Sequence, residues 1–332
     1  KQSPDERDFD VVVYGATGFT GRQAALYISQ NAPESLRWAI AGRSEERLQT
    51  VAQGIPNGAA PPIIVADAFD IDALDAMCRR TRVMLTTAGP FALYGRHLVD
   101  RCVEHAVDYV DITGETVFVA DLIEAYHDRA KASATRIIPF CGFDSVPSDL
   151  GVWYAVQELR KQGCQHIDRV DGAFLARGGL NGGTVASGLH MGEKGDQGRM
   201  EDVLLLNPPT QLSLAERSAS PDIRWPTYNP AMKTWLAPFI MGPINTRVVR
   251  RSNGLFQTFD TGYGPDFRYH EYMECKPPFA YGKALTVSLG LRTSDFLFRH
   301  KVGRQLIRWL TPNPGEGPSE SVMDNGFFRC RF

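Results

Sequence analysis

The chain has 332 residues, of which 43% are hydrophobic and 22% are charged, and its formal net charge is −2. This balance is ordinary for a folded globular protein of about two domains, and it excludes a largely disordered chain. The small net charge gives no reason to expect a nucleic acid partner. The scattered cysteines and histidines, with no Cys-x-x-Cys pair, give no support for a metal site.

The first expected element is a buried strand over 11–14 that ends in a glycine-rich turn and leads into a helix over 22–30. Gly15 permits a tight turn, Gly18 lets the main chain approach a phosphate, and Gly21 lets the helix pack closely on the strand. The amides at the start of such a helix face the charge of a dinucleotide pyrophosphate. The alternative is a plain tight turn. The pattern predicts a nicotinamide cofactor, bound by Gly15, Thr17, Gly18, Phe19, Thr20 and Gly21.

A second strand over 38–41 ends at Gly42-Arg43-Ser44, where the adenosine ribose lies in folds of this kind. NAD-binding folds usually place an acidic side chain at this point, and a carboxylate would repel a 2′-phosphate. The sequence instead offers Arg43 as a planar fork for phosphate, Ser44 as a hydroxyl donor and Arg47 one helical turn later. This pattern favours NADP(H) over NAD(H). The alternative is that both arginines are solvated charges at a helix start.

Strands and helices continue to alternate as far as residue 141. We predict strands over 62–67, 83–87, 109–111 and 137–141, and helices over 71–79, 95–105 and 117–133. Repeated βα units form a parallel sheet covered on both faces, with ligands at the carboxyl ends of its strands. The predicted fold class is α/β, with a Rossmann-type NADP-binding domain over 1–163. Two of the loops that follow these strands complete the predicted cofactor site with Asp67, Ala88, Gly89 and Pro90.

The remaining part, over 164–332, is expected to be an α+β substrate domain with a mostly antiparallel sheet. Its predicted β-rich segments are 170–176, 246–259, 268–274 and 285–291. One helix is expected to begin at Asn181-Gly182-Gly183-Thr184, and another to span 294–310 before the breaker Pro312-Asn313-Pro314-Gly315. The stretch 207–230 is rich in Pro and Ser and is expected to be a long loop.

Several motifs together resemble one family. They are Gly15-Ala16-Thr17-Gly18-Phe19-Thr20-Gly21, Ala41-Gly42-Arg43, Ala88-Gly89-Pro90-Phe91, Tyr109-Val110-Asp111-Ile112-Thr113-Gly114-Glu115, Cys141-Gly142-Phe143-Asp144, Gly182-Gly183-Thr184-Val185-Ala186-Ser187, Arg250-Arg251-Ser252-Asn253 and Pro314-Gly315-Glu316-Gly317-Pro318-Ser319. Over nearly its whole length the chain resembles the saccharopine dehydrogenase-like oxidoreductases, most nearly the bacterial trans-acting enoyl reductases and the animal lipid-droplet-associated relatives. The resemblance implies an NADP-binding Rossmann domain followed by an α+β domain that closes over the nicotinamide.

Two departures from the family qualify this resemblance. Similar proteins continue well beyond 315–317, so we expect the chain that ends at Phe332 to be an incomplete view of a longer native protein, with the family's C-terminal segment missing. Nothing in the sequence suggests the carboxylate clamps of a true saccharopine or lysine pathway enzyme. The family name therefore does not give the substrate.

Three residues are candidates for the chemistry, because hydride transfer needs a group that stabilises or protonates the developing anion. Tyr94 is a candidate proton donor; the alternative is an ordinary structural tyrosine. Asp144 could orient the carboxamide, relay a proton or cap its own turn. Thr184 and its neighbouring amides would stabilise an oxyanion at a helix start. His190, by contrast, is expected to be a structural histidine with satisfied hydrogen bonds; the alternative is an acid catalyst.

The apolar run from Trp235 to Ile244 is too short to span a bilayer. It could be a buried segment over a substrate pocket, an entry lip for an acyl or isoprenoid substrate, or a peripheral contact with lipid. The predicted function is an NADPH-dependent reductase of a conjugated double bond, or of a C=N or C=O group, in an apolar lipid- or polyketide-like substrate. The rival is a non-catalytic NADP-binding sensor or a lipid-surface protein. Buried reduced thiols suit a cytoplasmic setting, and a homodimer is a further expectation.

Overall fold

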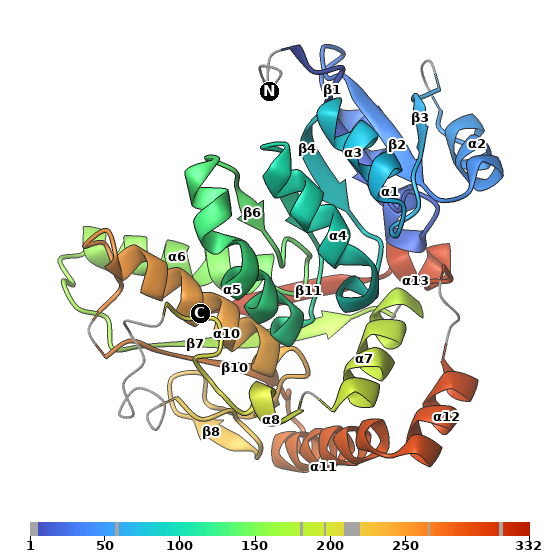
Figure 1. Ribbon diagram of the computed structural model, residues 1–332. Coiled ribbons are helices and arrows are strands. Elements are labelled where there is room, and N and C mark those ends of the chain that lie inside the picture. Colours follow the sequence, from blue (N-terminus) through green and yellow to red (C-terminus); the bar gives the residue numbers. More distant parts are fainter. Residues whose placement is uncertain are drawn as a thin grey trace. The chain divides into compact units, whose positions relative to one another are not determined.

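The computed structural model describes residues 6–56, 60–179, 182–195, 197–208, 220–264, 266–311 and 315–332. They form two compact units, each assembled from separate stretches of the chain (Figure 1). The first unit comprises Lys1–Cys141, Leu180–His190 and Thr311–Gly317, and the second comprises Gly142–Gly179, Met191–Leu310 and Pro318–Phe332. The first unit is therefore not one continuous segment, because two later stretches of the chain return to it.

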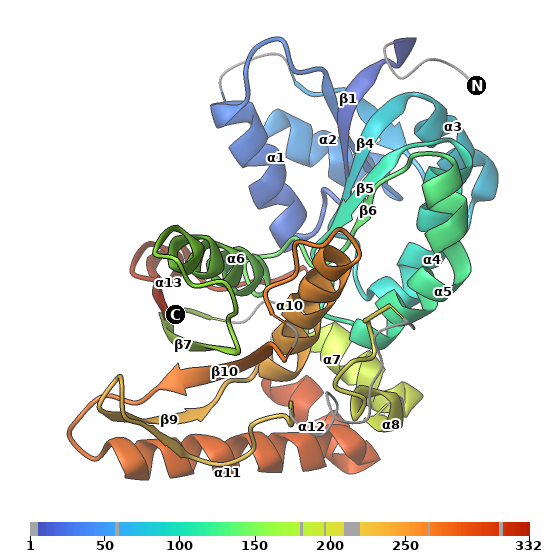
Figure 2. The same cartoon turned by 90° about the vertical axis from the view of Figure 1, so that its left-hand side faces the viewer.

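The first unit contains a parallel sheet whose described strands have the order β3-β2-β1-β4-β5-β6. The strands are β1 (Phe9–Tyr14), β2 (Trp38–Gly42), β3 (Ile63–Val65), β4 (Thr81–Thr86), β5 (Asp108–Asp111) and β6 (Ile137–Ile138). The helices between them are α1 (Phe19–Asn31), α2 (Glu45–Gln53), α3 (Ile71–Arg79), α4 (Phe91–Glu104) and α5 (Thr116–Ala132). Figure 2 shows α1 and α2 on one face of the sheet and α3, α4 and α5 on the other. The predicted Rossmann-type architecture is confirmed.

The middle of this sheet is β1, which pairs in parallel with β2 on one side and β4 on the other. Val12 and Val13 are completely buried there, as expected for a strand covered on both faces. The strand order runs from β1 to β3 in one direction and from β4 to β6 in the other. Ligands of such sheets bind at this switch point, outside the carboxyl ends of the strands.

The second unit contains a mixed sheet with the order β11-β7-β10-β9-β8. The strands are β7 (Arg169–Arg177), β8 (Thr227–Asn229), β9 (Thr234–Pro238), β10 (Arg268–Glu274) and β11 (Phe327–Arg331). The helices are α6 (Val146–Lys161), α8 (Gln197–Met200), α10 (Gly242–Gln257), α11 (Ala280–Arg299), α12 (Lys301–Leu310) and α13 (Glu320–Asp324), and α7 (Gly182–Lys194) begins in the first unit and ends in the second. In this second sheet, only the pair of β7 and β10 is parallel among the described strands, so the mostly antiparallel α+β prediction is confirmed.

Two predicted β segments are wrong, because 246–257 lies in helix α10, followed by a turn over 258–259, and 285–291 lies in helix α11. In α10 the buried positions include Thr246, Arg247, Arg250 and Asn253 besides Val249, so the helical spacing is carried mainly by polar side chains. In α11 the sequence over 285–291 alternates apolar and polar residues, which is typical of a strand. Only Ala284 and Ser288 of that helix are buried, four residues apart.

Two other expectations about this region also need correction. The helix predicted over 294–310 is two helices, because His300 between α11 and α12 has extended backbone angles. The predicted long loop over 207–230 contains β8, and its residues 209–219 lie outside the described part of the chain. Asn181 and the breaker residues 312–314 also lie outside it.

Candidate functional site

The glycine-rich turn lies between β1 and α1, at the carboxyl end of the central strand. Gly15 has a φ of +83°, and a Cβ there would lie 2.8 Å from the amide nitrogen of Ala88. A Cβ at Gly21 would overlap the carbonyl oxygen of Gly15. Both positions therefore require glycine, one for its backbone conformation and the other for the close packing of α1 on the turn.

Gly18 differs from these two glycines, since a Cβ there would meet only the carbonyl oxygen of Gly15, at 3.3 Å. The protein leaves the remaining space beside it open. Gly18 is also the N-cap of α1, and no side chain caps the first turn of that helix. An open space beside uncapped helical amides fits the pyrophosphate of a dinucleotide.

The adenosine end of the predicted site follows β2. Ser44 is the N-cap of α2, where its hydroxyl accepts a hydrogen bond from the amide of Arg47 at 3.4 Å. Arg43 and Arg47 are exposed, and within the described ranges neither forms an ion pair with a carboxylate. Asp67 follows β3, and its Oδ1 accepts a hydrogen bond from the amide of Phe69 at 2.9 Å. Two unpaired guanidinium groups fit a 2′-phosphate, so this end also suits NADP(H).

A buried carboxylate organises the loop between β4 and α4. Glu115 is 1% exposed. Its Oε1 accepts hydrogen bonds from the amide of Phe91 and the hydroxyl of Ser187, both at 2.7 Å, and its Oε2 accepts one from the amide of Ala92 at 2.9 Å. Ser187 belongs to α7, and its Oγ lies 3.6 Å from where a Cβ of Gly89 would be. Glu115 thus joins the Gly89-Pro90 loop to the first half of α7, a role that was not predicted from the sequence.

Glu115 is itself positioned by a second buried acid at the end of β5. Asp111 accepts hydrogen bonds from the amides of Thr113 and Phe140, at 3.0 and 3.1 Å, and from the hydroxyl of Tyr109 at 2.8 Å. The Oγ1 of Thr113 then accepts a hydrogen bond from the amide of Glu115 at 3.0 Å. Burial raises the pKa of Asp111 to about 6. The loop that places Glu115 is therefore held from its own strand.

The structure distributes the predicted catalytic residues between the two units. Thr184 lies exposed on α7 in the first unit, three residues before Ser187, and is therefore a neighbour of Ser187 on the helix surface. Tyr94 is half-buried on α4, and its ring lies edge-on to that of Phe69 at 5.9 Å. Asp144 belongs to the second unit. Their catalytic roles stay predictions.

His190, also on α7, does not match its expectation. Its Nε2 atom is buried and, in the part of the chain that the structure describes, has no hydrogen-bond partner. The expected structural histidine with satisfied hydrogen bonds is therefore wrong. A buried ring nitrogen without a partner needs an explanation, and a ligand or water atom would supply one.

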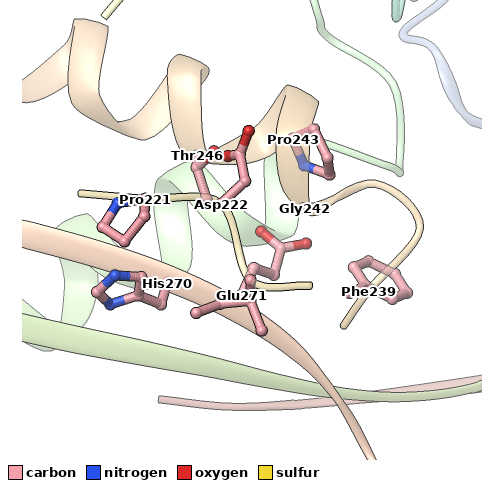
Figure 3. Close-up of a pocket in the computed structure, with 9 residues that line it drawn as sticks. Pro221, Asp222, Phe239, Gly242, Pro243, Thr246, His270 and Glu271 are labelled. Atoms are coloured by element: carbon pink, nitrogen blue, oxygen red, sulfur yellow. The ribbon is translucent and has the colours of Figure 1, made fainter. Parts of the chain in front are cut away.

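The second unit has a buried polar cluster beside a small pocket, which Figure 3 shows. Glu271 of β10 lines this pocket and accepts hydrogen bonds from the side-chain amide of Asn245 at 2.7 Å and from the hydroxyl of Tyr269 at 3.0 Å. The same amide nitrogen donates to the carbonyl of Asp144 at 2.6 Å. Burial raises the pKa of Glu271 to about 7 and also raises that of Asp144. Glu271 was not predicted from the sequence, because its partner Asn245 lies 26 residues away along the chain.

The apolar run from Trp235 to Ile244 contributes mainly to the second unit's core. Leu236 and Ala237 in β9 are completely buried, whereas Ile240 is 53% exposed. Arg247, which follows the run, is completely buried and pairs with Asp222 through two contacts of 2.9 Å. The lipid contact and the substrate lip both stay predictions.

Every helix in the described residues is too short or too polar to cross a membrane. Within the same ranges, no group of three or more His, Cys, Asp or Glu side chains is arranged to hold a metal ion.

Comparison with known proteins connects these features to a family. Residues 11–138 match the saccharopine dehydrogenase NADP-binding domain. A trans-acting enoyl reductase from Mycobacterium bovis (strain BCG / Pasteur 1173P2) is 36% identical over 347 residues, which cover 98% of this chain and 81% of that protein. One from Mycobacterium ulcerans (strain Agy99) is 35% identical over 99% of this chain and 81% of its own length. The first unit therefore binds NADP(H), as its glycine loop and exposed arginines predict.

Proposed function

The chain belongs to the trans-acting enoyl reductases of the saccharopine dehydrogenase-like group and is an NADP-dependent oxidoreductase, and from this premise we propose that it reduces a carbon–carbon double bond conjugated to a carbonyl. The proposed substrate is an apolar acyl or polyketide-like chain. The names of the relatives support the reaction, and the apolar run from Trp235 to Ile244 supports the substrate class.

The observation that carries this proposal is the hydrogen bond from Ser187 to Glu115, at 2.7 Å. It holds the first half of α7 against the Gly89-Pro90 loop, which follows β4 next to the central strand. In sheets of this kind that loop lies beside the nicotinamide. The start of α7, with Gly182, Gly183 and Thr184, is thereby tied to the cofactor's reactive end.

The residues that would hold the cofactor come from three loops. The Gly15 to Gly21 turn would hold the pyrophosphate, Arg43 and Arg47 the 2′-phosphate, and the Gly89-Pro90 loop the nicotinamide. When bound, NADPH supplies a hydride to an electrophilic carbon of the substrate. The protein must then stabilise the negative charge that develops on the substrate's carbonyl oxygen.

We assign that stabilisation to the Thr184 hydroxyl and the neighbouring main-chain amides of α7. A helix N-terminus concentrates amide donors and partial positive charge, which suit an enolate oxygen. The proton that completes the saturated product comes from Tyr94 or from solvent. His190 is a second candidate donor, because its Nε2 is buried without a partner among the described residues.

The test is NADPH oxidation by the purified protein with a medium-chain enoyl thioester, compared with the matching 3-ketoacyl thioester and a cyclic imine. The wild-type protein should oxidise NADPH most rapidly with the enoyl thioester. Loss of one oxyanion donor typically costs about a hundredfold in turnover, so Thr184→Val should lower kcat by about that factor and leave NADPH binding intact. Thr293→Val, at an exposed helical threonine of the second unit, is the matched control.

Two outcomes would overturn the proposal. Tight NADPH binding without turnover of any of the three substrates would favour the rival function, a non-catalytic NADP sensor. Preferential turnover of the ketoacyl thioester or the imine would replace the enoyl substrate with a C=O or C=N group. Equal effects of Thr184→Val and Thr293→Val on kcat would remove the oxyanion role from Thr184.

A further inference from the structure

A short segment from the far end of the chain lies against the cofactor loop. Residues Gly315–Gly317 belong to the first unit, although nearly all of the preceding hundred residues belong to the second. The guanidinium of Arg22 in α1 donates hydrogen bonds to the carbonyls of Thr17, at 2.8 Å, and of Gly315, at 3.2 Å. One side chain thus bridges the glycine-rich turn and this segment, which we call the strap.

The strap also reaches the start of α7. The amide of Gly182 donates a hydrogen bond to the carbonyl of Glu316 at 3.0 Å. The strap therefore contacts the first turns of two helices, α1 and α7. These are the helix that would face the pyrophosphate and the helix that carries Thr184.

Two glycines fit the strap to this place. Gly317 packs directly on the ring of Phe19, and a Cβ there would overlap that ring. Gly315 has a φ of +94°, a backbone conformation that residues other than glycine rarely adopt. A Cβ there would lie 4.0 Å from a terminal nitrogen of Arg47. The strap accordingly extends from the first turn of α1 toward the arginine assigned to the 2′-phosphate.

We propose that the strap, Gly315–Gly317, is part of the NADP(H) site. It covers the first turn of α1 between the pyrophosphate loop and Arg47, and it fixes Arg22 and the start of α7 beside the bound dinucleotide. Because Arg22 is bonded to the strap, its positive charge is held at the pyrophosphate loop. This inference depends on NADP(H) binding and not on the proposed substrate, so a failure of the enoyl reductase assignment leaves it standing.

The decisive variant is Gly317→Ala, because one added carbon forces the strap away from Phe19. NADPH affinity, measured by the fluorescence of the bound nucleotide, should fall about tenfold. Gly282→Ala is the matched control, since no atom lies within 4 Å of a Cβ at that helical glycine, and it should leave affinity unchanged. In a Phe19→Ala background the ring is absent, so adding Gly317→Ala should cost less than about twofold.

Hydrogen exchange gives a second readout that does not depend on the variants. NADPH should slow amide exchange over residues 315–319 and 182–187 of the wild-type protein, because the strap and the start of α7 become ordered together. An unchanged NADPH affinity in folded Gly317→Ala would overturn the proposal. An equal loss of NADPH affinity from Gly317→Ala with and without the Phe19 ring would also overturn it. So would amide exchange over 315–319 that is the same with and without NADPH. If Gly317→Ala does not fold, the exchange experiment decides alone.

Discussion

Buried charged side chains have different structural roles in the two units. In the first unit, the carboxylates of Asp111 and Glu115 accept hydrogen bonds from main-chain amides of the loops at the carboxyl edge of the sheet. In the second, Arg247, Arg250 and Arg251 of α10 donate to main-chain carbonyls of Met200, Asp202, Val203 and Leu206. The acids fix the shape of loops at the predicted cofactor site, whereas the arginines attach an irregular segment to a helix.

This difference predicts that charge removal damages function in one unit and stability in the other. A buried ion pair is costly to break, because the partner that remains is left uncompensated in a poorly solvated place. A buried acid that accepts hydrogen bonds from the main-chain amides of a loop instead fixes the shape of that loop. Four variants measure this difference between the units.

The largest effect is expected from Arg247→Met in the second unit. This change leaves the carboxylate of Asp222 unpaired and the carbonyls of Met200 and Asp202 without their donor. Breaking a buried pair of this kind costs about 3–5 kcal/mol in the free energy of unfolding, which urea denaturation would measure. Arg299→Met, which removes an exposed pair with Asp295, is the control and should cost less than about 1 kcal/mol. Similar losses in both variants would contradict the structural role of Arg247.

The next effect concerns pH and Glu271. Its pKa of about 7 in the folded protein lies above the ordinary 4.5, so the folded state binds the proton more tightly than the unfolded state. Stability from this group is therefore complete below about pH 4.5 and is lost as the pH rises toward 7, by roughly 3 kcal/mol at most. Glu271→Gln should flatten the difference in unfolding free energy between acidic and neutral pH, whereas Glu320→Gln, at an exposed site, should not. If the unfolding free energy of Glu271→Gln changes with pH as steeply as that of the wild-type protein, other buried acids cause the pH dependence.

Arg43→Ala tests the charge of the first unit's ligand. A charge-assisted hydrogen bond contributes about 1.5–3 kcal/mol, so NADPH should bind about one to two decades more weakly, and NADH should bind almost as before. Titration of nucleotide fluorescence with both cofactors measures this directly. Equal losses of affinity for NADPH and NADH would show that Arg43 does not bind the 2′-phosphate.

The smallest effect is expected from Ser187→Ala, which removes one hydrogen bond to Glu115. A single hydrogen bond contributes about 0.5–1.5 kcal/mol, so kcat should fall by up to about tenfold while the NADPH dissociation constant stays within about twofold. Ser288→Ala is the control, since that hydroxyl bonds only to a carbonyl of its own helix in the second unit. A weaker NADPH affinity with normal kcat would show that α7 is needed for cofactor binding and not for the reaction.

The sequence predicted the first unit much better than the second, for a physical reason. The glycine turn, the parallel sheet and the exposed arginines depend on local backbone requirements and on apolar runs, which a sequence displays directly. Glu115 was visible only as part of a resembling motif, because its partners Phe91 and Ser187 lie 24 and 72 residues away. Nothing local in the chain indicates that this acid joins a loop to α7.

In the second unit the strand prediction over 246–259 was wrong because a helix buries polar and charged side chains there. Helix α10 buries Arg247, Arg250 and Asn253, so its inner face is largely polar and its apolar residues do not follow the usual helical pattern. Burial of Arg247 and Arg250 is offset by hydrogen bonds that they donate to the carbonyls of distant residues, Asp202 and Val203. The strand predicted over 246–259 failed for that reason, and so did the expectation that the second unit is rich in β structure throughout that stretch.

The most direct test of the proposed reaction follows a label from NADPH into the product. The wild-type protein is incubated with a medium-chain enoyl thioester and NADPH deuterated at the transferable position of its nicotinamide ring, and the product is analysed by mass spectrometry and NMR. We predict a saturated thioester with one deuterium on the carbon β to the carbonyl, since conjugate reduction delivers hydride there. An unlabelled thioester, no NADPH oxidation, or deuterium on the carbonyl carbon would contradict it.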